Sequence, residues 1–325
     1  KSNMQFRTQI SIEPFDRRID HSQSGLMIGS CFTDHIGRRM ADAGFRVAVN
    51  PFGVMFNPVS VVSVLERLGT GQRYTADDLQ RDGERWFSYD FHGDFAARSA
   101  EEALRRMNGA VESGAAALQA ADYVVLTLGT AWVYRLEGGR VAANCHKMPQ
   151  RLFTRSRMSV EETVEVLTRA IEGPLAGRHV ILTVSPVRHV GDGLAGNSLS
   201  KAVLRVAAGC LAERYEQVDY FPAFEILNDD LRDYRFYDAD MVHPSPVAVQ
   251  YVWEQWLACA VAPESQRPAA EAERLSTAMR HRPLDPGSEA HRVFCRSMLD
   301  RVERLEREYP GIDWSRWRRY FSAES

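Results

Sequence analysis

The chain has 325 residues, with 40 Lys and Arg against 43 Asp and Glu and a formal net charge of −3. This length suits one large α/β domain, with or without a helical extension, and the balanced charge favours neither nucleic acid nor an anionic membrane surface as a partner. No segment approaches the ~20 apolar residues of a membrane span, and the N-terminal residues have no apolar leader core. We therefore expect a cytoplasmic protein with no nucleic-acid or membrane partner.

The cysteines do not form a recognisable framework. Their odd number and the lack of a CxxC pair fit a reduced intracellular protein better than a secreted one, and no spacing indicates a zinc site. A chain of this length does not need disulfides for its stability. The cysteines are Cys31, Cys145, Cys210, Cys259 and Cys295.

Short apolar runs bounded by Gly, Ser, Thr or Pro predict buried strands, and segments with helical spacing lie between them. The segment 34–44 ends at a candidate C-cap glycine. The segment 159–173 begins with Ser159 as an N-cap and has Glu162 at the matching capping-box position. Strands that alternate with helices imply a mostly parallel sheet covered on both faces. The predicted strands are 26–30, 123–129, 179–186 and 217–224.

The residues just after each predicted strand carry the most weight for function. Sheets of this kind bind ligands at the carboxyl ends of their strands, where the strand order reverses. Ser30 and Cys31 follow the first predicted strand. Residues 130–134 follow the second predicted strand, and residues 185–189 lie at the end of the third predicted strand. These three groups are the first places to look for a site.

The composition changes at about residue 262, where Ala, Arg, Glu and Pro become frequent. A stripe of Leu, Val and Met at helical spacing follows within residues 292–314. We expect a main domain at 4–261 and a linker with a helical C-terminal extension at 262–325. The extension would pack on the main domain or on a second subunit, which would make a homo-oligomer. Residues 314–321 interleave aromatics with arginines, as polyanion-binding segments do, but a solvated helix face is the favoured interpretation.

Cys31 is the first candidate nucleophile. A strand that stops at a glycine and turns into a helix presents the next side chains beside free backbone N–H groups and the positive end of the helix dipole. A thiol placed there has a lowered pKa and is a competent nucleophile. On spacing alone, the alternative is a structural Cys31 with Ser30 as a plain N-cap.

Asp240 and His243 are a candidate base and its orienting carboxylate. They are three residues apart, just before a Pro-Ser-Pro stretch and a helical segment, so that one loop or first turn carries both. Together with a nucleophile, His243 as the base and Asp240 as its orienting carboxylate would form a catalytic triad. An isolated DxxH pattern is a weak signal by itself.

Five short motifs, taken together, resemble the GSCFA family. They are GSCF at 29–32, NPFGVMFNP at 50–58, NCHK at 144–147, SPVRH at 185–189 and DMVHPS at 240–245. That family is similar to the SGNH, or GDSL, hydrolases, a group of esterases and acyltransferases built on a flavodoxin-like sheet. The resemblance covers about residues 4–260. It implies a three-layer, flavodoxin-like, SGNH-hydrolase-like α/β fold with a parallel sheet.

The resemblance also assigns catalytic roles. It aligns Cys31 with the superfamily nucleophile, with Ser30 as the alternative, and it aligns Asp240 and His243 with the DxxH block in which the histidine activates the nucleophile. A glycine and an asparagine complete the oxyanion hole in the superfamily, but Ala131 stands where the asparagine is expected. We expect the replacement groups, which bind the oxyanion or the substrate, among Gly53, Asn57, Thr130 and Asn144.

Further polar residues are candidates for the pocket. An Arg near a strand end suits a substrate carboxylate or phosphate, although pairing with acids on neighbouring loops would explain it equally well. A metal site built from the histidines is the weaker alternative, because no HxH or HExxH pattern occurs; we expect no metal and no cofactor. The substrate-binding candidates are His92, His146, Arg188 and His189.

The resemblance therefore predicts an esterase or acyltransferase that forms a covalent acyl-enzyme at Cys31 or Ser30. Its acyl donor and acceptor would be small molecules, by default a short acyl group on a sugar or a small alcohol. The competing class is a catalytically inactive small-molecule binding module, in keeping with Ala131. A third idea, a thiol redox sensor, would use Cys145 as the resolving cysteine.

Overall fold

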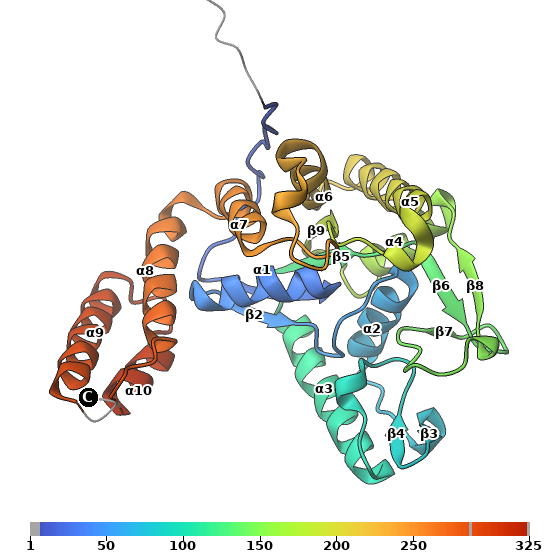
Figure 1. The fold of residues 1–325 in the computed structure, drawn as a ribbon, viewed down its shortest axis with the longest axis horizontal. Coiled ribbons are helices and arrows are strands. Elements are labelled where there is room, and N and C mark those ends of the chain that lie inside the picture. The colour runs from blue at the N-terminus through green and yellow to red at the C-terminus, as the bar shows by residue number, and fades with distance from the viewer. Residues whose placement is uncertain (1–6, 286–287, 324–325) are drawn as a thin grey trace, which may run out of the picture.

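A five-stranded parallel sheet lies at the centre of the protein (Figure 1). The structure, a computed structural model, describes residues 7–285 and 288–323, so the predicted domain bounds at 4 and 325 lie outside the described residues. The strand order β10-β9-β5-β1-β2 becomes 2-1-3-4-5 when the strands are numbered along the chain, a common order of doubly wound sheets. The strands are β1 (Ser24–Gly29), β2 (Arg46–Val49), β5 (Tyr123–Leu128), β9 (His179–Val184) and β10 (Val218–Phe221).

The four strands predicted from apolar runs are confirmed, and β2 is the strand of the central sheet that the sequence analysis missed. β2 is four residues long and lies at the sheet edge, where it pairs only with β1. An edge strand is covered less completely than a central one, so its sequence does not need a continuous apolar run. In contrast, every residue of β5 and β9 is buried.

Helices cover both faces of the sheet, which makes three layers. Alternate strand residues face opposite layers: Leu26 and Ile28 pack with one group of helices and Met27 with the other. The first layer contains α2 (Pro58–Thr70), α3 (Ala100–Ala120), α4 (Val160–Glu172) and α5 (Gly193–Arg214). The second contains α1 (Cys31–Asp42) and α7 (Pro246–Ala260), with α6 (Ala223–Glu225) and a π-helical turn (Ile226–Leu231) before α7.

Both predicted helices are present. The capping box of α4 forms as expected, because the Ser159 side chain accepts a hydrogen bond from the Glu162 N–H and the Glu162 carboxylate accepts from the Ser159 N–H. α1 ends one residue before Ala43, and Gly44 follows with a left-handed φ of 86°. α1 starts earlier than the predicted 34–44, at Cys31, which therefore occupies its first position.

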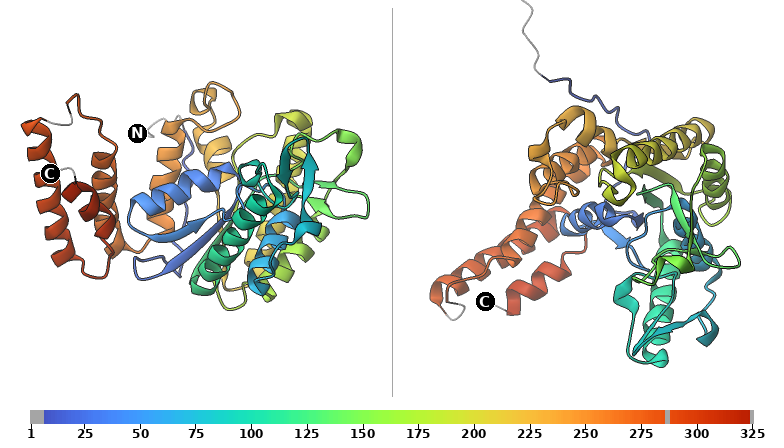
Figure 2. Two further views of the ribbon diagram at one scale, coloured as in Figure 1. Left: turned by 90° about the horizontal axis from the view of Figure 1, so that it is seen from below. Right: turned by 45° about the vertical axis from the view of Figure 1, so that its right-hand side comes forward.

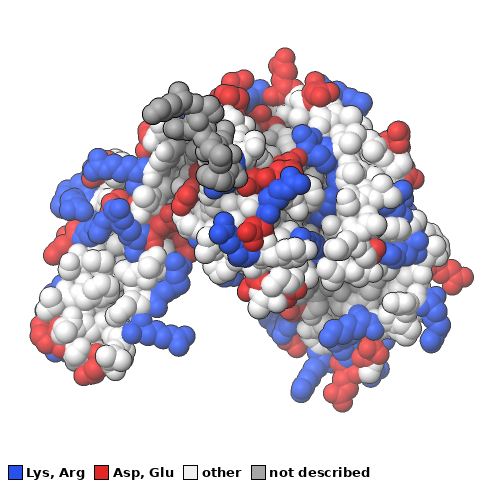
Figure 3. Space-filling model, turned by 45° about the horizontal axis from the view of Figure 1, so that its top comes forward, with Lys and Arg blue, Asp and Glu red and all other residues white. Residues whose placement is uncertain are grey.

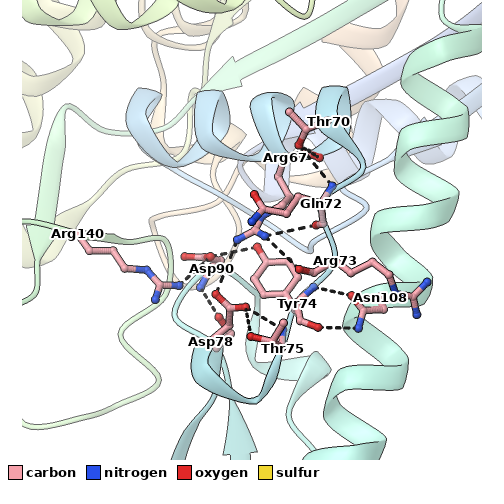
Figure 4. A network of polar contacts seen from close by, with 11 residues as sticks. Arg67, Thr70, Gln72, Arg73, Tyr74, Thr75, Asp78, Asp90, Asn108 and Arg140 are labelled. Carbon is pink, nitrogen blue, oxygen red and sulfur yellow. Dashed lines mark hydrogen bonds and ion pairs between the residues drawn. The ribbon is translucent and has the colours of Figure 1, made fainter.

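A polar network between α2 and α3 fixes the chain between them (Figure 4). Asn108 on α3 accepts from the Tyr74 N–H and donates to the Tyr74 carbonyl, at 2.7 and 3.0 Å. The Tyr74 hydroxyl donates to Asp90, which also pairs with Arg140. Two small sheets lie beside the main one. They consist of β3 (Gln80–Asp82) with β4 (Arg85–Phe87), and of β6 (Trp132–Arg135) with β7 (Val141–Ala142) and β8 (Thr154–Arg157).

Three helices form the C-terminal part, which has its own core and stands beside the main domain (Figure 2). They are α8 (Pro263–Met279), α9 (Glu289–Glu308) and α10 (Ser315–Ala323). Part of the segment for which we expected a linker is thus the helix α8. Its Ser276 hydroxyl donates to the carbonyl of Asp42 at the end of α1, and the Asp42 carboxylate pairs with Arg280 and Arg316. α8 therefore attaches this part to the main domain. The aromatic residues Trp317 and Phe321 of α10 are buried, while its arginines lie toward the surface.

Acidic and basic side chains are interspersed on the face seen in Figure 3, as the balanced composition leads one to expect. None of the helices in the described ranges combines the length and the apolar character that crossing a membrane requires.

Candidate functional site

The turn at residues 29–31 places Cys31 at the carboxyl edge of the sheet. Gly29 ends β1 with φ of 154°, and a Cβ atom added to it would lie 2.2 Å from the carbonyl oxygen of Thr127 on β5. The Gly29 N–H donates to Asn50 Oδ1 (2.8 Å), and Asn50 Nδ2 donates to Asp34 in the first turn of α1 (2.6 Å). Glycine and the Asn50 side chain together fix how sharply β1 turns into α1.

Gly29→Ala is expected to destabilise the protein by about 2–3 kcal/mol, because the new methyl group overlaps the Thr127 carbonyl and the backbone must shift. Thermal or urea unfolding measures the change. Gly71→Ala is the control, since nothing lies within 4 Å of a Cβ at this exposed helix end. Both glycines have positive φ, but Gly71 lies in the left-handed region that other residues tolerate best, so the difference between the two variants reports the clash and the backbone strain at Gly29 together. Equal losses in the two variants would contradict this explanation.

Ser30 and Cys31 have different surroundings. Ser30 is completely buried, its hydroxyl oxygen accepts from the Phe32 N–H (3.3 Å), and its own N–H donates to the Thr127 carbonyl. Ser30 therefore acts as the N-cap of α1. Cys31 is half-buried and stands at the first position of the helix. The geometry favours Cys31 over Ser30 as the reactive side chain.

The pKa of the Cys31 thiol is raised, contrary to the lowered value that we expected at a helix N-terminus. Burial is the main cause, and the nearby Asp34 carboxylate adds to it. The backbone N–H groups of Cys31 and Phe32 and the ammonium of Lys201 act in the opposite direction, but they do not compensate. Cys31 thus needs a base to remove its proton at neutral pH.

Asp240 and His243 form a hydrogen-bonded pair before α7. Asp240 Oδ2 accepts from His243 Nδ1 at 2.6 Å, and Asp240 Oδ1 accepts from the backbone N–H groups of Val242 and His243. Met241 between them has a left-handed φ of 59°, which lets the loop curl around the carboxylate. These hydrogen bonds, chiefly that from the imidazole, lower the pKa of Asp240 to about 2. The neutral imidazole then has its Nε2 lone pair free to act as a base.

His243 lies beside α1. His243 and His35 line the same pocket of about 670 Å³, and His35 is on α1 one helical turn after Cys31. The C-terminal part closes this pocket with Thr277 and Arg280. No hydrogen bond joins the Cys31 Sγ to an imidazole in the part of the chain that the structure describes. Catalytic hydrogen bonds are often loose before substrate binds.

The backbone donors of the predicted oxyanion groups are already engaged. The N–H of Gly53 donates to the Asn50 carbonyl, and the N–H groups of Gly129 and Thr130 both donate to the Phe56 carbonyl. The side-chain oxygen of Asn57 caps α2 by accepting from the Ser60 N–H. The hydroxyls of Thr130 and Ser200 hydrogen-bond each other, and Ser200 also accepts from the Ala131 N–H. These groups hold the loops around the site in place.

Asn144, His146 and His92 also have structural partners. Asn144 Oδ1 accepts from the His146 N–H, and the His146 ring contacts the Ser88 carbonyl and packs against Phe87. Phe87 belongs to a cluster separate from the one that contains Cys31. His92 pairs with Asp94 and lies against Gly53, where an added Cβ would approach it within 2.2 Å. The polar contacts of these three side chains thus do not include Cys31.

The strand-end residues Arg188 and His189 have different roles. The Arg188 guanidinium lies 3.9 Å from the centre of the Tyr237 ring and donates to the Met241 carbonyl, so it supports the loop that carries Asp240 and His243. The His189 Nε2 is buried and has no hydrogen-bond partner among the described residues. Burial, together with the charges of Lys201 and His243, lowers the pKa of His189 to about 4. His189 is therefore neutral at pH 7 and is the site's unpartnered polar ring.

Two observations concern the metal and redox alternatives. The described residues contain no group of three or more His, Cys, Asp or Glu side chains that could hold a metal ion. All five cysteines, each within the described ranges, are free thiols. Cys145 belongs to the cluster around Phe87 and Tyr89, whereas Cys31 packs against the second helical layer.

Lys201 and Ser200 on α5 are the site residues that sequence reasoning missed. Both are almost fully buried, and both contact the loop after β5. Their partners are mostly backbone groups, and a hydrogen bond to the backbone does not require a particular residue type that the sequence would reveal. The one available signal was a lysine at a core-facing position of a helix.

Fold and site together define a three-layer α/β protein with a thiol and a His–Asp pair at the carboxyl edge of its sheet. The GSCFA family matches residues 25–256, and the family described as "GSCFA domain protein, C-terminal domain" matches residues 272–324. The chain therefore belongs to the GSCFA family. The second match covers α9, α10 and part of α8, beyond the region for which the sequence showed a resemblance.

Other comparisons add little. No curated protein matches the chain. The chain is similar to a solved structure described as "The structure of a putative platelet activating factor from Streptococcus pneumonia", with 15% identity over 76% of this chain and 83% of that chain, at a TM-score of 0.35.

Proposed function

We propose that this protein is an SGNH-like esterase or acyltransferase that forms a covalent acyl-enzyme at Cys31, with His243 as general base and Asp240 as the carboxylate that orients it. The observation that carries the proposal is the hydrogen-bonded His243–Asp240 pair, which lines a pocket along the same helix that begins with Cys31. The flavodoxin-like strand order agrees with the SGNH resemblance. The half-buried thiol next to a capping serine supports Cys31 as the nucleophile.

The reaction has two balanced halves. His243 Nε2 takes the thiol proton while Sγ attacks the acyl carbonyl carbon, which gives a tetrahedral intermediate. Collapse breaks the bond to the leaving oxygen or sulfur, which receives the proton from His243, and leaves a thioester on Cys31. Water or an acceptor hydroxyl or amine then attacks the thioester, gives its proton to His243, and restores the thiol as the acylated product leaves.

Transfer is as natural an outcome as hydrolysis, because thioesters pass acyl groups readily to hydroxyls and amines. The pocket beside His243 is lined by charged and polar side chains, including His35, Arg38 and Gln250. Such a lining suits a small polar acceptor better than a long acyl chain. We therefore propose a short acyl group and a small, hydroxyl-bearing acceptor such as a sugar.

A binding module without catalysis is the second candidate. The observation that favours it is the engagement of the backbone donors at Gly53, Gly129 and Thr130, which leaves few N–H groups to hold an oxyanion. In this case a small molecule would bind the pocket beside His243, but no acyl group would reach Cys31.

Turnover of a panel of activated esters and thioesters, with and without sugar and alcohol acceptors, distinguishes the two functions. The wild-type protein should release the leaving group catalytically and form acylated acceptor, and a Cys31→Ala/His243→Ala double variant should do neither. His281→Ala is the control, since this exposed histidine lies outside the pocket. Equal, background-level release by wild type and double variant over the panel, together with saturable binding of a panel compound, would favour the binding module.

A further inference from the structure

Lys201 is a buried lysine at the carboxyl edge of the sheet. It is one of three lysines in the chain and lies on α5 with 1% of its surface exposed. Its Nζ donates to the carbonyl of Gly129 (2.6 Å) and to that of Ser185 (2.7 Å), which follow β5 and β9 directly. β1, which leads to Cys31, is the next strand beside β5. Lys201 therefore lies among the same strand ends as the thiol.

The charge of Lys201 is not compensated by a carboxylate. Among the described residues no Asp or Glu forms an ion pair with it, and its two partners are neutral carbonyls. A buried cation without a counter-ion is costly, so burial lowers the pKa of Lys201 to about 7. The Cys31 side chain is the group whose negative charge raises that pKa again, and Lys201 in turn lowers the pKa of Cys31.

The other titratable groups of the site do not provide a positive charge that would stabilise a thiolate at Cys31. Asp34 on α1 opposes the thiolate, and His189 stays neutral at pH 7. His243 is already paired with Asp240 and serves as the proposed base. An ammonium has three N–H groups, of which two go to Gly129 and Ser185; the third has no partner in the part of the chain that the structure describes.

We propose that Lys201 is a positioning and electrostatic residue of the Cys31 site, whose buried ammonium favours negative charge on the sulfur and fixes the ends of β5 and β9 beside it. This extends the proposed function, because a thiolate is the form that attacks an acyl carbon. The electrostatic effect on Cys31 does not depend on any acyl substrate. A purely structural lysine would hold the two loops without acting on the thiol.

The pH profile of Cys31 alkylation separates these roles. Iodoacetamide modification is followed at the Cys31 peptide by mass spectrometry in wild type, Lys201→Met and Lys201→Gln, with Lys147→Met as the control at an exposed lysine. Loss of the charge should lower the rate at and below neutral pH by about tenfold in both Lys201 variants, and the difference from wild type should shrink at higher pH, where Lys201 itself loses its proton. Lys147→Met should match wild type.

Lys201→Gln keeps a side-chain N–H donor for the carbonyls but has no charge, so it remains informative if Lys201→Met fails to fold. A lower unfolding temperature with an unchanged alkylation profile would overturn the proposal, as would a Gln variant with the wild-type profile. A shifted profile in a protein that never becomes acylated would support the role of Lys201 and count against the proposed acyl transfer. The two ideas can therefore fail separately.

Discussion

Cys31→Ala is expected to lose at least about 10³-fold in the rate of acyl release, because it removes the proposed nucleophile and the neighbouring Ser30 hydroxyl is buried and caps α1. Ser30→Ala removes a helix cap, which costs about 1 kcal/mol of stability, but it should keep the rate within a few-fold of wild type. Steady-state release from the best activated ester or thioester measures both. The reason for the contrast is the engaged, fully buried Ser30 hydroxyl beside a half-buried thiol.

Unfolding temperatures accompany these rates, so that a loss of folded protein is not mistaken for a loss of chemistry. Near-complete loss of turnover in folded Ser30→Ala, with Cys31→Ala still active, would reverse the assignment of the nucleophile.

His243→Ala is expected to lower the same rate by about 10²–10⁴-fold, because the raised pKa of Cys31 leaves little thiolate without a base. Asp240→Asn should lose at least about 10²-fold, since an amide disturbs the imidazole tautomer that the carboxylate fixes. Arg188→Ala is the comparison, because this residue contacts the loop from the segment after β9. It removes support for the loop but no proton-transfer group, so its rate should fall less than that of either variant.

The pH dependence gives a further check on this pair. The lowered pKa of Asp240, about 2, keeps its carboxylate ionised through the range in which the protein would be assayed. An acidic limb of the rate profile near pH 4 that disappears in Asp240→Asn would contradict this. A His243→Ala variant with wild-type turnover would remove His243 from the mechanism altogether.

Much of the fold could be predicted because buried strands and amphipathic helices have periodic sequences. The apolar runs before Cys31 and before Gly129 correspond to β1 and β5, and the Ser159–Glu162 pattern marks the start of α4. β2 was missed because its apolar stretch, residues 47–49, is only three residues long. α8 was read as a linker because Pro263 and Pro268 and its many polar residues hide a helix that buries a narrow face.

The candidate site was predictable where its chemistry follows the chain closely. The neighbouring Ser30 and Cys31 and the three-residue spacing of Asp240 and His243 are visible in the sequence, and the structure adds their hydrogen bonds. Lys201 could not be found in this way, because its partners are carbonyls from two distant loops.

The direction of the Cys31 pKa was mispredicted for a similar reason. The helix N-terminus is readable from the sequence, whereas the burial that outweighs it depends on the tertiary fold.

Locating an acyl group on the protein tests the central proposal most directly. Wild-type protein is incubated briefly with activated short-chain esters and thioesters and quenched in acid. Its intact mass is measured by mass spectrometry, and the protein is then digested to map the modified peptide. We expect one acyl group, on Cys31, which is absent from Cys31→Ala and forms much more slowly in His243→Ala. An acyl group on Ser30 or elsewhere, or an unmodified protein under conditions in which the same preparation turns the ester over, would contradict covalent catalysis by Cys31.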